Sequence, residues 1–297
     1  MRQLRILFSL TLALLLTVGC GGGGGGGSTG TLSLRLADGP FPDTSCLTAA
    51  NVVVNGVEVQ SEGGWVDIPL AGGAPQTFNL LDLRSGLDTQ LAVGDLATGT
   101  YHQIRLHLDS ATLVFTDSTE KSFTVPSGMQ SGIKINVNPQ FLIAAGQTTP
   151  LLLDFSLAES FHVTGTGGDP TCEDLKSEET IFNPVIHAVN LDTSGVLAGI
   201  VYYADGTTAA PDVVVTVFAA GAAQDAAPVG TTVSANGSTV NAPLGSYALH
   251  LDPGTYDVYG PGDTDADGNG IELLAAGAVI TSQQITTQDL TTSIAVP

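Results

Sequence analysis

Three aspartates alternate with other residues near the end of the chain, in a pattern typical of calcium-binding loops. Asp263, Asp265 and Asp267 occupy the first, third and fifth positions, and a glycine follows where such a loop turns sharply. Together with the backbone carbonyl of Asn269, these carboxylates supply the oxygen ligands that Ca²⁺ prefers. The twelfth position is Leu274 instead of a bidentate glutamate. The sequence therefore predicts either a weak calcium site or a solvated acidic turn.

A second group of polar side chains lies on one face of a predicted strand over residues 101–115. Gln103, Arg105, His107 and Asp109 alternate there with aliphatic residues. Because successive side chains of a strand point to opposite faces, these four share one face and the aliphatic residues share the other. This face is interpreted either as the lining of a ligand-binding groove or as a solvated sheet surface with cross-strand ion pairs.

No pattern in the sequence identifies a catalytic centre. The zinc-protease motif HExxH and paired CxxC motifs are both absent. Trp65, the only tryptophan, is either a platform for stacking a sugar or part of a sandwich core. We therefore predict a protein that is not an enzyme. The alternative is an extracytoplasmic hydrolase that uses paired carboxylates, although no particular pair stands out.

The chain begins like a secreted and lipid-modified protein. An apolar run covers residues 4–18. Arg2 precedes this run, Arg5 interrupts it, and Gly19 and Cys20 follow it. The junction resembles the bacterial lipobox, which implies a signal peptide over residues 1–19 and lipidation, with palmitate as one acyl chain, at Cys20. Residues 20–30 are rich in glycine and form a predicted flexible linker. Because glycine follows the cysteine, we expect an outer-membrane lipoprotein, on the periplasmic side or exposed at the cell surface.

Two further cysteines remain once Cys20 is lipidated. Cys46 and Cys172 form a single pair in an oxidising compartment, where a disulfide is the usual state. We predict a disulfide between them, with two free thiols as the alternative.

The amino-acid composition limits which kinds of partner and which fold class the sequence can have. The formal net charge of −21 makes nucleic acid an improbable partner, since phosphate binding needs clustered lysine and arginine. The chain is rich in glycine and aliphatic residues, and no stretch shows a sustained helical period. The sequence predicts an all-β protein of two β-sandwich domains, because the length exceeds one typical domain.

The first predicted domain covers residues 31–192. An Asn55–Gly56 hairpin and a turn at residues 61–64 are rival predictions from turn chemistry. Other predicted strands lie at residues 31–36, 65–68, 78–83, 101–115, 133–137, 151–155 and 181–189.

This region resembles the domain of unknown function 4382, which is found in bacterial and archaeal surface lipoproteins. The resemblance rests on residues 36–40, 101–106, 126–134, 153–155 and 183–186. It implies one strand over residues 51–60 with the turn at 61–64, and it supplies no function. The resemblance does not extend to the insertion that carries Cys172.

The second predicted domain covers residues 193–297. It has predicted strands at residues 195–201, 213–218, 245–249 and 253–258, and it resembles the carboxypeptidase-regulatory or transthyretin-like β-sandwich. Such domains are non-catalytic modules that accompany other domains or bind sugars. We therefore expect a non-enzymatic surface lipoprotein for adhesion, carbohydrate or envelope-protein binding, or envelope scaffolding.

Overall fold

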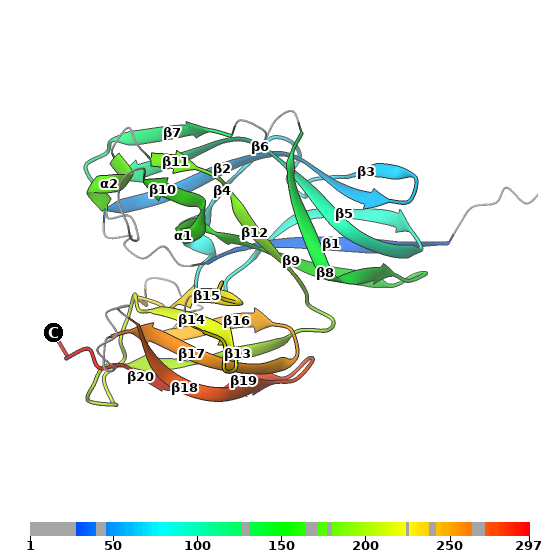
Figure 1. Ribbon diagram of the computed structural model, residues 1–297. Helices are drawn as coiled ribbons and strands as arrows, with labels where there is room; N and C mark the ends of the chain where they lie inside the picture. Colours follow the sequence, from blue (N-terminus) through cyan, green and yellow to red (C-terminus); the bar gives the residue numbers. More distant parts are fainter. Residues whose placement is uncertain are drawn as a thin grey trace, which may run out of the picture.

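The computed structural model describes residues 28–39, 46–125, 131–163, 172–176, 180–223, 226–237, 242–262 and 271–297. Within these ranges the protein consists of strands with only short helical segments, arranged around two separate apolar cores (Figure 1). The all-β class predicted from the sequence is confirmed. A search of the same ranges finds no helix with the length and apolar character needed to cross a bilayer.

Two sheets face each other in the first domain. One has the strand order β12-β9-β1-β5, and the other has the order β3-β2-β6-β7, with β4 added beside β2 and β8 beside β6. A short pair, β10 and β11, lies beside them. The elements are β1 (Thr29–Asp38), β2 (Leu47–Ser61), β3 (Gly64–Ile68), β4 (Gln76–Asn79), the 3-10 helix η1 (Leu80–Leu83), β5 (Thr89–Ala97), β6 (Gly99–Phe115), β7 (Glu120–Thr124), β8 (Ile133–Ile143), β9 (Thr148–Ser156), α1 (Leu157–Ser160), β10 (Phe161–Val163), α2 (Cys172–Lys176), β11 (Thr180–Phe182) and β12 (Val185–Asn190).

Strict alternation explains why these strands form a sandwich. Along β1, Leu32, Leu34 and Leu36 are fully buried, while the residues between them are half-buried. On β6, Ile104 and Leu106 are likewise buried against the same core. Each strand thus presents one apolar face, and the hydrophobic effect holds the two faces together.

The structure corrects two strand predictions and decides a third. Residues 78–83 are the end of β4 followed by η1, because the Asn79 side chain accepts a hydrogen bond from the Leu81 amide and starts a helical turn. Residues 181–189 are split into β11 and β12, because Pro184 lacks the amide donor that a continuous ladder needs. β2 runs through Asn55–Gly56 with an irregularity in register, so the turn lies at residues 61–64.

The second domain has its own core between two further sheets. One has the order β16-β13-β19, with β20 also beside β13, and the other has the order β15-β14-β17-β18. The predicted boundary at residue 193 lies between β12 and β13. The elements are β13 (Gly195–Tyr202), β14 (Val214–Ala219), β15 (Gly230–Val233), β16 (Ser246–Leu251), β17 (Gly254–Pro261), β18 (Ile271–Ile280), β19 (Ile285–Thr287) and β20 (Leu290–Thr291).

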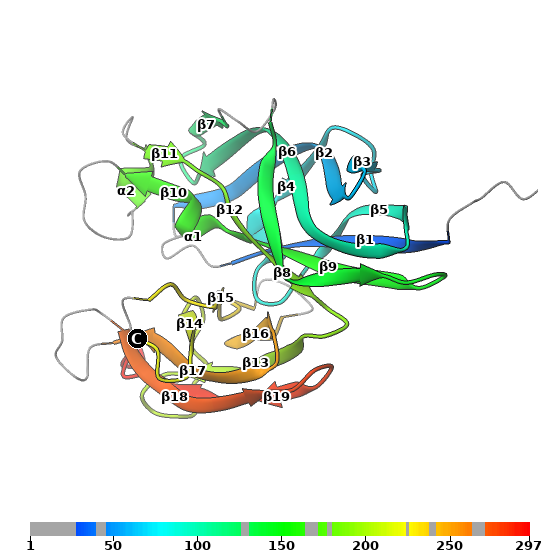
Figure 2. The ribbon, with the colours of Figure 1, turned by 45° about the vertical axis from the view of Figure 1, so that its right-hand side comes forward.

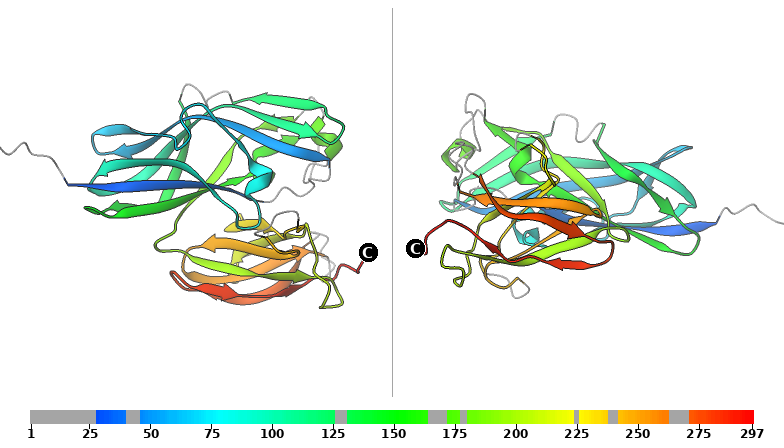
Figure 3. Two further views of the ribbon diagram at one scale, coloured as in Figure 1. Left: turned by 180° about the vertical axis from the view of Figure 1, so that it is seen from behind. Right: turned by 60° about the horizontal axis from the view of Figure 1, so that its bottom comes forward.

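The two domains are stacked, with β15 and β16 turned toward the first domain (Figure 2). The loop between η1 and β5, residues 84–88, reaches from the first domain to this surface (Figure 3). Ser85 Oγ donates a hydrogen bond to the Val233 carbonyl at 2.9 Å. At Gly86, which has a φ of 82°, a Cβ atom would lie 2.6 Å from Ala248 Cβ. The domain contact therefore requires glycine at this position.

Replacing Gly86 with alanine is expected to loosen the domain contact. The added methyl group meets Ala248 across the contact, whereas the same change at Gly73, with a φ of 81°, meets nothing within 4 Å. Both variants lose about 1 kcal/mol or more from the unfavourable backbone conformation, so Gly73→Ala is the matched control. Small-angle X-ray scattering should show a longer particle for Gly86→Ala alone. Equal particle lengths for the two variants would contradict the assignment of this contact.

Candidate functional site

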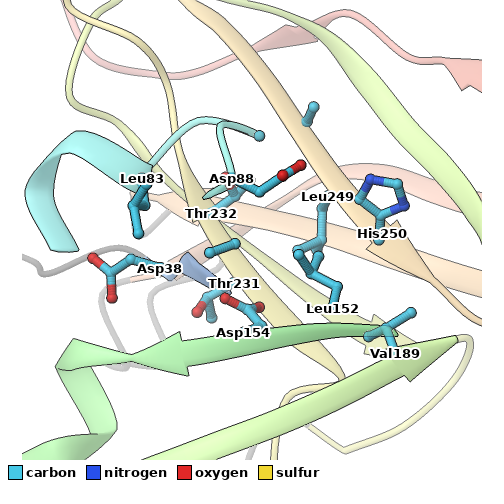
Figure 4. A pocket seen from close by; sticks show the side chains of 13 residues that line it. Asp38, Leu83, Asp88, Leu152, Asp154, Val189, Thr231, Thr232, Leu249 and His250 are labelled. Atoms are coloured by element: carbon cyan, nitrogen blue, oxygen red, sulfur yellow. The ribbon is translucent and has the colours of Figure 1, made fainter. Parts of the chain in front are cut away.

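A small cavity lies where the two domains meet (Figure 4). Its walls come from the ends of β1 and β9, β12 and the 84–88 loop of the first domain, and from β15 and β16 of the second. Asp38, Asp88, Asp154 and His250 are its titratable side chains. Its volume is about 30 Å³, which is room for about two water molecules. Carboxylates from separate elements are thus gathered around a space that is far smaller than a substrate.

Asp38 is the most unusual side chain of this cavity. It is only 5% exposed, and neither of its carboxylate oxygens has a hydrogen-bond partner. It is the last residue of β1, one position beyond Ala37, which pairs with Asp154 on the parallel neighbour β9. Burial raises the pKa of Asp38 well above its usual value, and the negative charge of Asp154 raises it further, while Arg84 and the nearby Leu157 amide oppose both. The protein therefore favours the protonated carboxylic acid at this position.

Asp154 has a more polar surrounding. Burial raises the pKa of Asp154 to about 6, with the nearby His187 opposing and Glu159 supporting the shift. His187 lies directly across from Asp154 in the β9–β12 ladder, and its Nε2 is 3.3 Å from Glu159 Oε2. That hydrogen bond raises the pKa of His187 and lowers the pKa of Glu159. Asp154 therefore changes its charge close to physiological pH.

The remaining cavity residues differ in how they are paired. Asp88 forms an ion pair with Arg35. The Nδ1 atom of His250 is buried without a hydrogen-bond partner, and burial lowers the pKa of this imidazole while Asp88 opposes the shift. In Figure 4 the carboxylate of Asp38 points away from Asp154. The two carboxylates therefore do not face each other across a space in which a bond could be cleaved.

A more open groove adjoins this cavity. It shares Val189 and His250 with the cavity and has a volume of about 270 Å³. Its polar lining comes from Asn136 and Asn138 on β8, His187 on β12, and His250 and Asp252 at the end of β16; its apolar lining is Ile186, Ala188, Val189, Val229 and Leu251. Amide, imidazole and carboxylate groups beside aliphatic side chains can hold a small ligand with hydroxyl groups.

The predicted ligand face on β6 is present, and its side chains bind partners on the neighbouring strands β2 and β8. Arg105 Nη1 and His107 Nε2 lie 3.0 and 2.9 Å from the same oxygen, Glu58 Oε2 on β2. Gln103 donates to Asn136 at 2.7 Å, and Asp109 accepts from Asn55 at 3.3 Å; these are the outer contacts of the network. The face is thus a network of cross-strand pairs, and ligand binding by it stays a prediction.

Trp65 belongs to the same network. The Arg105 guanidinium carbon lies 3.7 Å from the centre of the Trp65 ring, so the arginine covers one face of the indole. That face is not free to stack on a sugar. Burial opposes ionisation of Glu58, but the hydrogen bonds from His107 and Arg105 outweigh it and lower the pKa of Glu58. The cluster of Glu58, Trp65, Arg105 and His107 therefore stabilises the sheet.

Replacing Glu58 with glutamine is expected to destabilise the first domain by about 1–3 kcal/mol, since Arg105 then keeps a poorly solvated charge without its anion. Arg105 and Glu58 side chains are only 18% and 20% exposed. The matched control is Glu62→Gln in the exposed β2–β3 turn. Denaturation followed by the fluorescence of Trp65, the only tryptophan, measures the difference. If both variants unfold at the same denaturant concentration, the network contributes no stability.

Several predicted sites cannot be placed. Cys20 and the signal peptide lie outside the described residues, as do Asp263, Asp265, Asp267 and Asn269, so lipidation and calcium binding stay predictions. Cys46 is disulfide-bonded, while the side chain of Cys172 lies outside the described residues, so the pairing of these two stays a prediction. Within the described ranges, no three His, Cys, Asp or Glu side chains are grouped to hold a metal ion.

Sequence reasoning missed the cavity residues. Asp38 and Asp154 lie at or near the ends of apolar strands, and both fall in stretches that carry the family resemblance, residues 36–40 and 153–155. That shared position was the available signal. It did not show that β1 and β9 are adjacent and parallel, or that the second domain covers their ends.

Comparison with known families supports the resemblance of the first domain. A family model described as "Domain of unknown function (DUF4382)" matches residues 29–169, a range that includes Asp38 and Asp154. No curated protein gives a match to the chain.

Solved structures give only distant likenesses. The Bacillus anthracis TIE protein is 12% identical with a TM-score of 0.19, covering 90% of this chain and 34% of its own. A leucine-rich repeat protein from Bacteroides thetaiotaomicron is 13% identical with a TM-score of 0.20, covering 90% and 26%. The minor pilin GBS52 of Streptococcus agalactiae is 11% identical with a TM-score of 0.23, covering 89% and 96%. The chain thus spans about a third and a quarter of the first two. TM-scores this low do not establish a common fold, so the fold rests on the sheets described above.

Proposed function

We propose that this chain is a lipid-anchored, non-enzymatic surface protein that binds a carbohydrate or another envelope component in the groove between its two domains. The signal-peptide pattern and Cys20 support attachment to the outer membrane. The resemblance of the second domain to sugar-binding or accessory β-sandwiches supports a binding role. Calcium at Asp263, Asp265 and Asp267 belongs to the same proposal, as a stabiliser of the second domain.

The groove beside His250 is the observation that carries this proposal. Its volume of about 270 Å³ suits a small polar unit such as one sugar residue, and both domains contribute hydrogen-bonding groups. Asn136 and Asp252 stand on opposite domains and supply donor and acceptor groups. Residues 177–297 contain no lysine or arginine, so a polyanionic ligand would be repelled. A neutral saccharide or an uncharged peptide segment is the chemistry that fits.

One observation favours a second candidate, the hydrolase with paired carboxylates. Asp38 and Asp154 line one cavity, and a pKa of about 6 for Asp154 is what a general acid needs. Against it stand the cavity volume of about 30 Å³ and the diverging carboxylates. Turnover would first require the domains to separate.

The binding proposal is tested with the secreted chain carrying Cys20→Ser, labelled fluorescently and offered to purified envelope polysaccharide and peptidoglycan of the native host. We expect saturable binding that is displaced by unlabelled protein. Asp252→Asn and Asn136→Asp should each weaken it about tenfold, as expected for a lost polar contact. Asp67→Asn on exposed β3 is the control. If both groove variants bind as tightly as the unchanged protein, the groove is not the binding site. If the protein binds neither material, the proposed function is wrong.

A further inference from the structure

Between the residues that the structure describes, few hydrogen bonds join the two domains. Ser85 Oγ bonds the Val233 carbonyl, and Gly39 packs beside Thr231, whose Oγ1 would lie 3.4 Å from a Cβ added to the glycine. No ion pair that joins two described residues crosses from one domain to the other. Domain docking therefore depends on packing and is sensitive to charge at the contact.

Acidic side chains gather at this contact. Asp38 on β1 lies near enough to Asp154 on β9 to feel its negative charge, and Arg84, just after η1, is the cation that acts on Asp38. Asp154 also faces His187 on β12 and Glu159 in α1, and these two form a hydrogen bond with each other. Acidic side chains of the first domain thus outnumber its basic side chains at the surface that the second domain covers.

Among the described residues, the remaining walls of the cavity supply no unpaired positive charge that would neutralise Asp38 and Asp154. Arg35 is paired with Asp88, and the group of the second domain that faces Asp88 is His250, which burial keeps neutral more readily than usual. Asp252 adds a further acid in the adjoining groove, where burial raises its pKa. Since residues 193–297 hold no lysine or arginine, the second domain offers no permanent cation to Asp38 or Asp154.

The cavity is too small to hydrate these groups when they ionise. About 30 Å³ admits about two waters, whereas a carboxylate can accept about four hydrogen bonds. Neither Asp38 oxygen has a protein hydrogen bond of normal geometry, and the Leu157 amide offsets only the smallest part of the effect of burial. An ionised Asp38 or Asp154 gains solvation if the second domain moves away from the ends of β1 and β9.

We propose that Asp38 and Asp154 form a proton-controlled latch between the two domains. With both carboxyls protonated, the second domain stays docked on the ends of β1 and β9. Loss of the protons favours an open arrangement in which both carboxylates are more fully hydrated. Because the groove beside His250 has walls from both domains, opening also takes that groove apart. The latch does not depend on which ligand the groove binds.

The segment that connects the two domains can act as the hinge for this movement. β12 ends at Asn190, and its side chain accepts a hydrogen bond from the Asp192 amide while its carbonyl accepts from the Ser194 amide. β13 starts at Gly195. The linker is thus a single compact turn, and a change in a few backbone angles suffices to swing the second domain.

The latch is tested by small-angle scattering and hydrogen exchange on the secreted chain with Cys20→Ser, at about pH 5 and about pH 8. Each proton released on opening lowers the docking constant by up to about tenfold per pH unit across the titration. The particle should therefore be longer at about pH 8, and the amides of β15 and β16 should exchange faster than those of β17.

The double variant Asp38→Asn, Asp154→Asn should stay docked at both pH values. Asp67→Asn, an exposed carboxylate on β3, should behave like the unchanged chain. The latch is wrong if the unchanged chain has the same length at both pH values, or if the double variant still opens. Should the double variant fail to fold, each single variant is measured in its place, and each should show a reduced change with pH.

Discussion

Asp154→Asn is expected to raise the free energy of unfolding above about pH 7 by about 1–2 kcal/mol. The folded protein holds the pKa of Asp154 at about 6, whereas an aspartate of the unfolded chain titrates near about 4. Stability is therefore lost as pH rises from about 4 to about 6, and the whole loss persists at higher pH. A shift of about two units corresponds to at most about 3 kcal/mol, and partial exposure of Asp154 reduces it. Asparagine does not ionise and avoids the loss.

The comparison that isolates this effect is a pair of urea denaturation series, one below about pH 4 and one above about pH 7. Below about pH 4 both proteins carry a neutral side chain at this position, so their stabilities should converge. Asp95→Asn, at an exposed position of β5, is the control for loss of a surface charge. A constant difference across the pH range would mean that the substitution acts through packing and not through ionisation.

Removing the disulfide of Cys46 is expected to have the largest effect on stability. If Cys172 is its partner, the bond closes a loop of more than 100 residues, for which the chain-entropy model gives an upper estimate of about 5 kcal/mol. Cys46→Ser, in a Cys20→Ser background, should unfold at a much lower denaturant concentration than the parent.

Peptide mapping without reductant checks the pairing directly. The predicted result is one linked peptide that contains Cys46 and Cys172, and Cys172→Ser should destabilise the protein as much as Cys46→Ser does. Reduced parent protein serves as the control, and it should match both variants. The absence of this linked peptide, or unequal effects of the two substitutions, would refute the pairing.

Most strands could be predicted from the local alternation of apolar and polar residues. Residues 31–36 and 101–115 alternate between apolar and polar side chains, and both lie within long strands whose apolar face is buried. The resemblance placed the turn at residues 61–64 correctly, where Asn55–Gly56 alone suggested a hairpin. The strand over 78–83 was wrong because a capping bond of Asn79 overrides the apolar character of the residues that follow.

The candidate site could not be predicted from the periodicity of apolar residues, because it depends on which strands are neighbours in space. Asp38 and Asp154 are separated by more than 100 residues, and their proximity follows from parallel pairing of β1 and β9. Their burial follows from docking of β15 and β16, which are parts of another domain. Glu58 was missed for a similar reason, because cross-strand register and not spacing brings it to Arg105.

Product analysis tests the central claim most directly, which is that the site between the domains binds without cleaving. The secreted chain with Cys20→Ser is incubated with the envelope polysaccharide and peptidoglycan used for binding, at about pH 5 and about pH 8, and the soluble fraction is analysed by mass spectrometry. We expect the protein to be retained on the material at about pH 5, and no sugar or peptide fragments to be released at either pH. Fragments that appear with the unchanged site and disappear with Asp154→Asn would contradict the account and identify the carboxylates as hydrolytic.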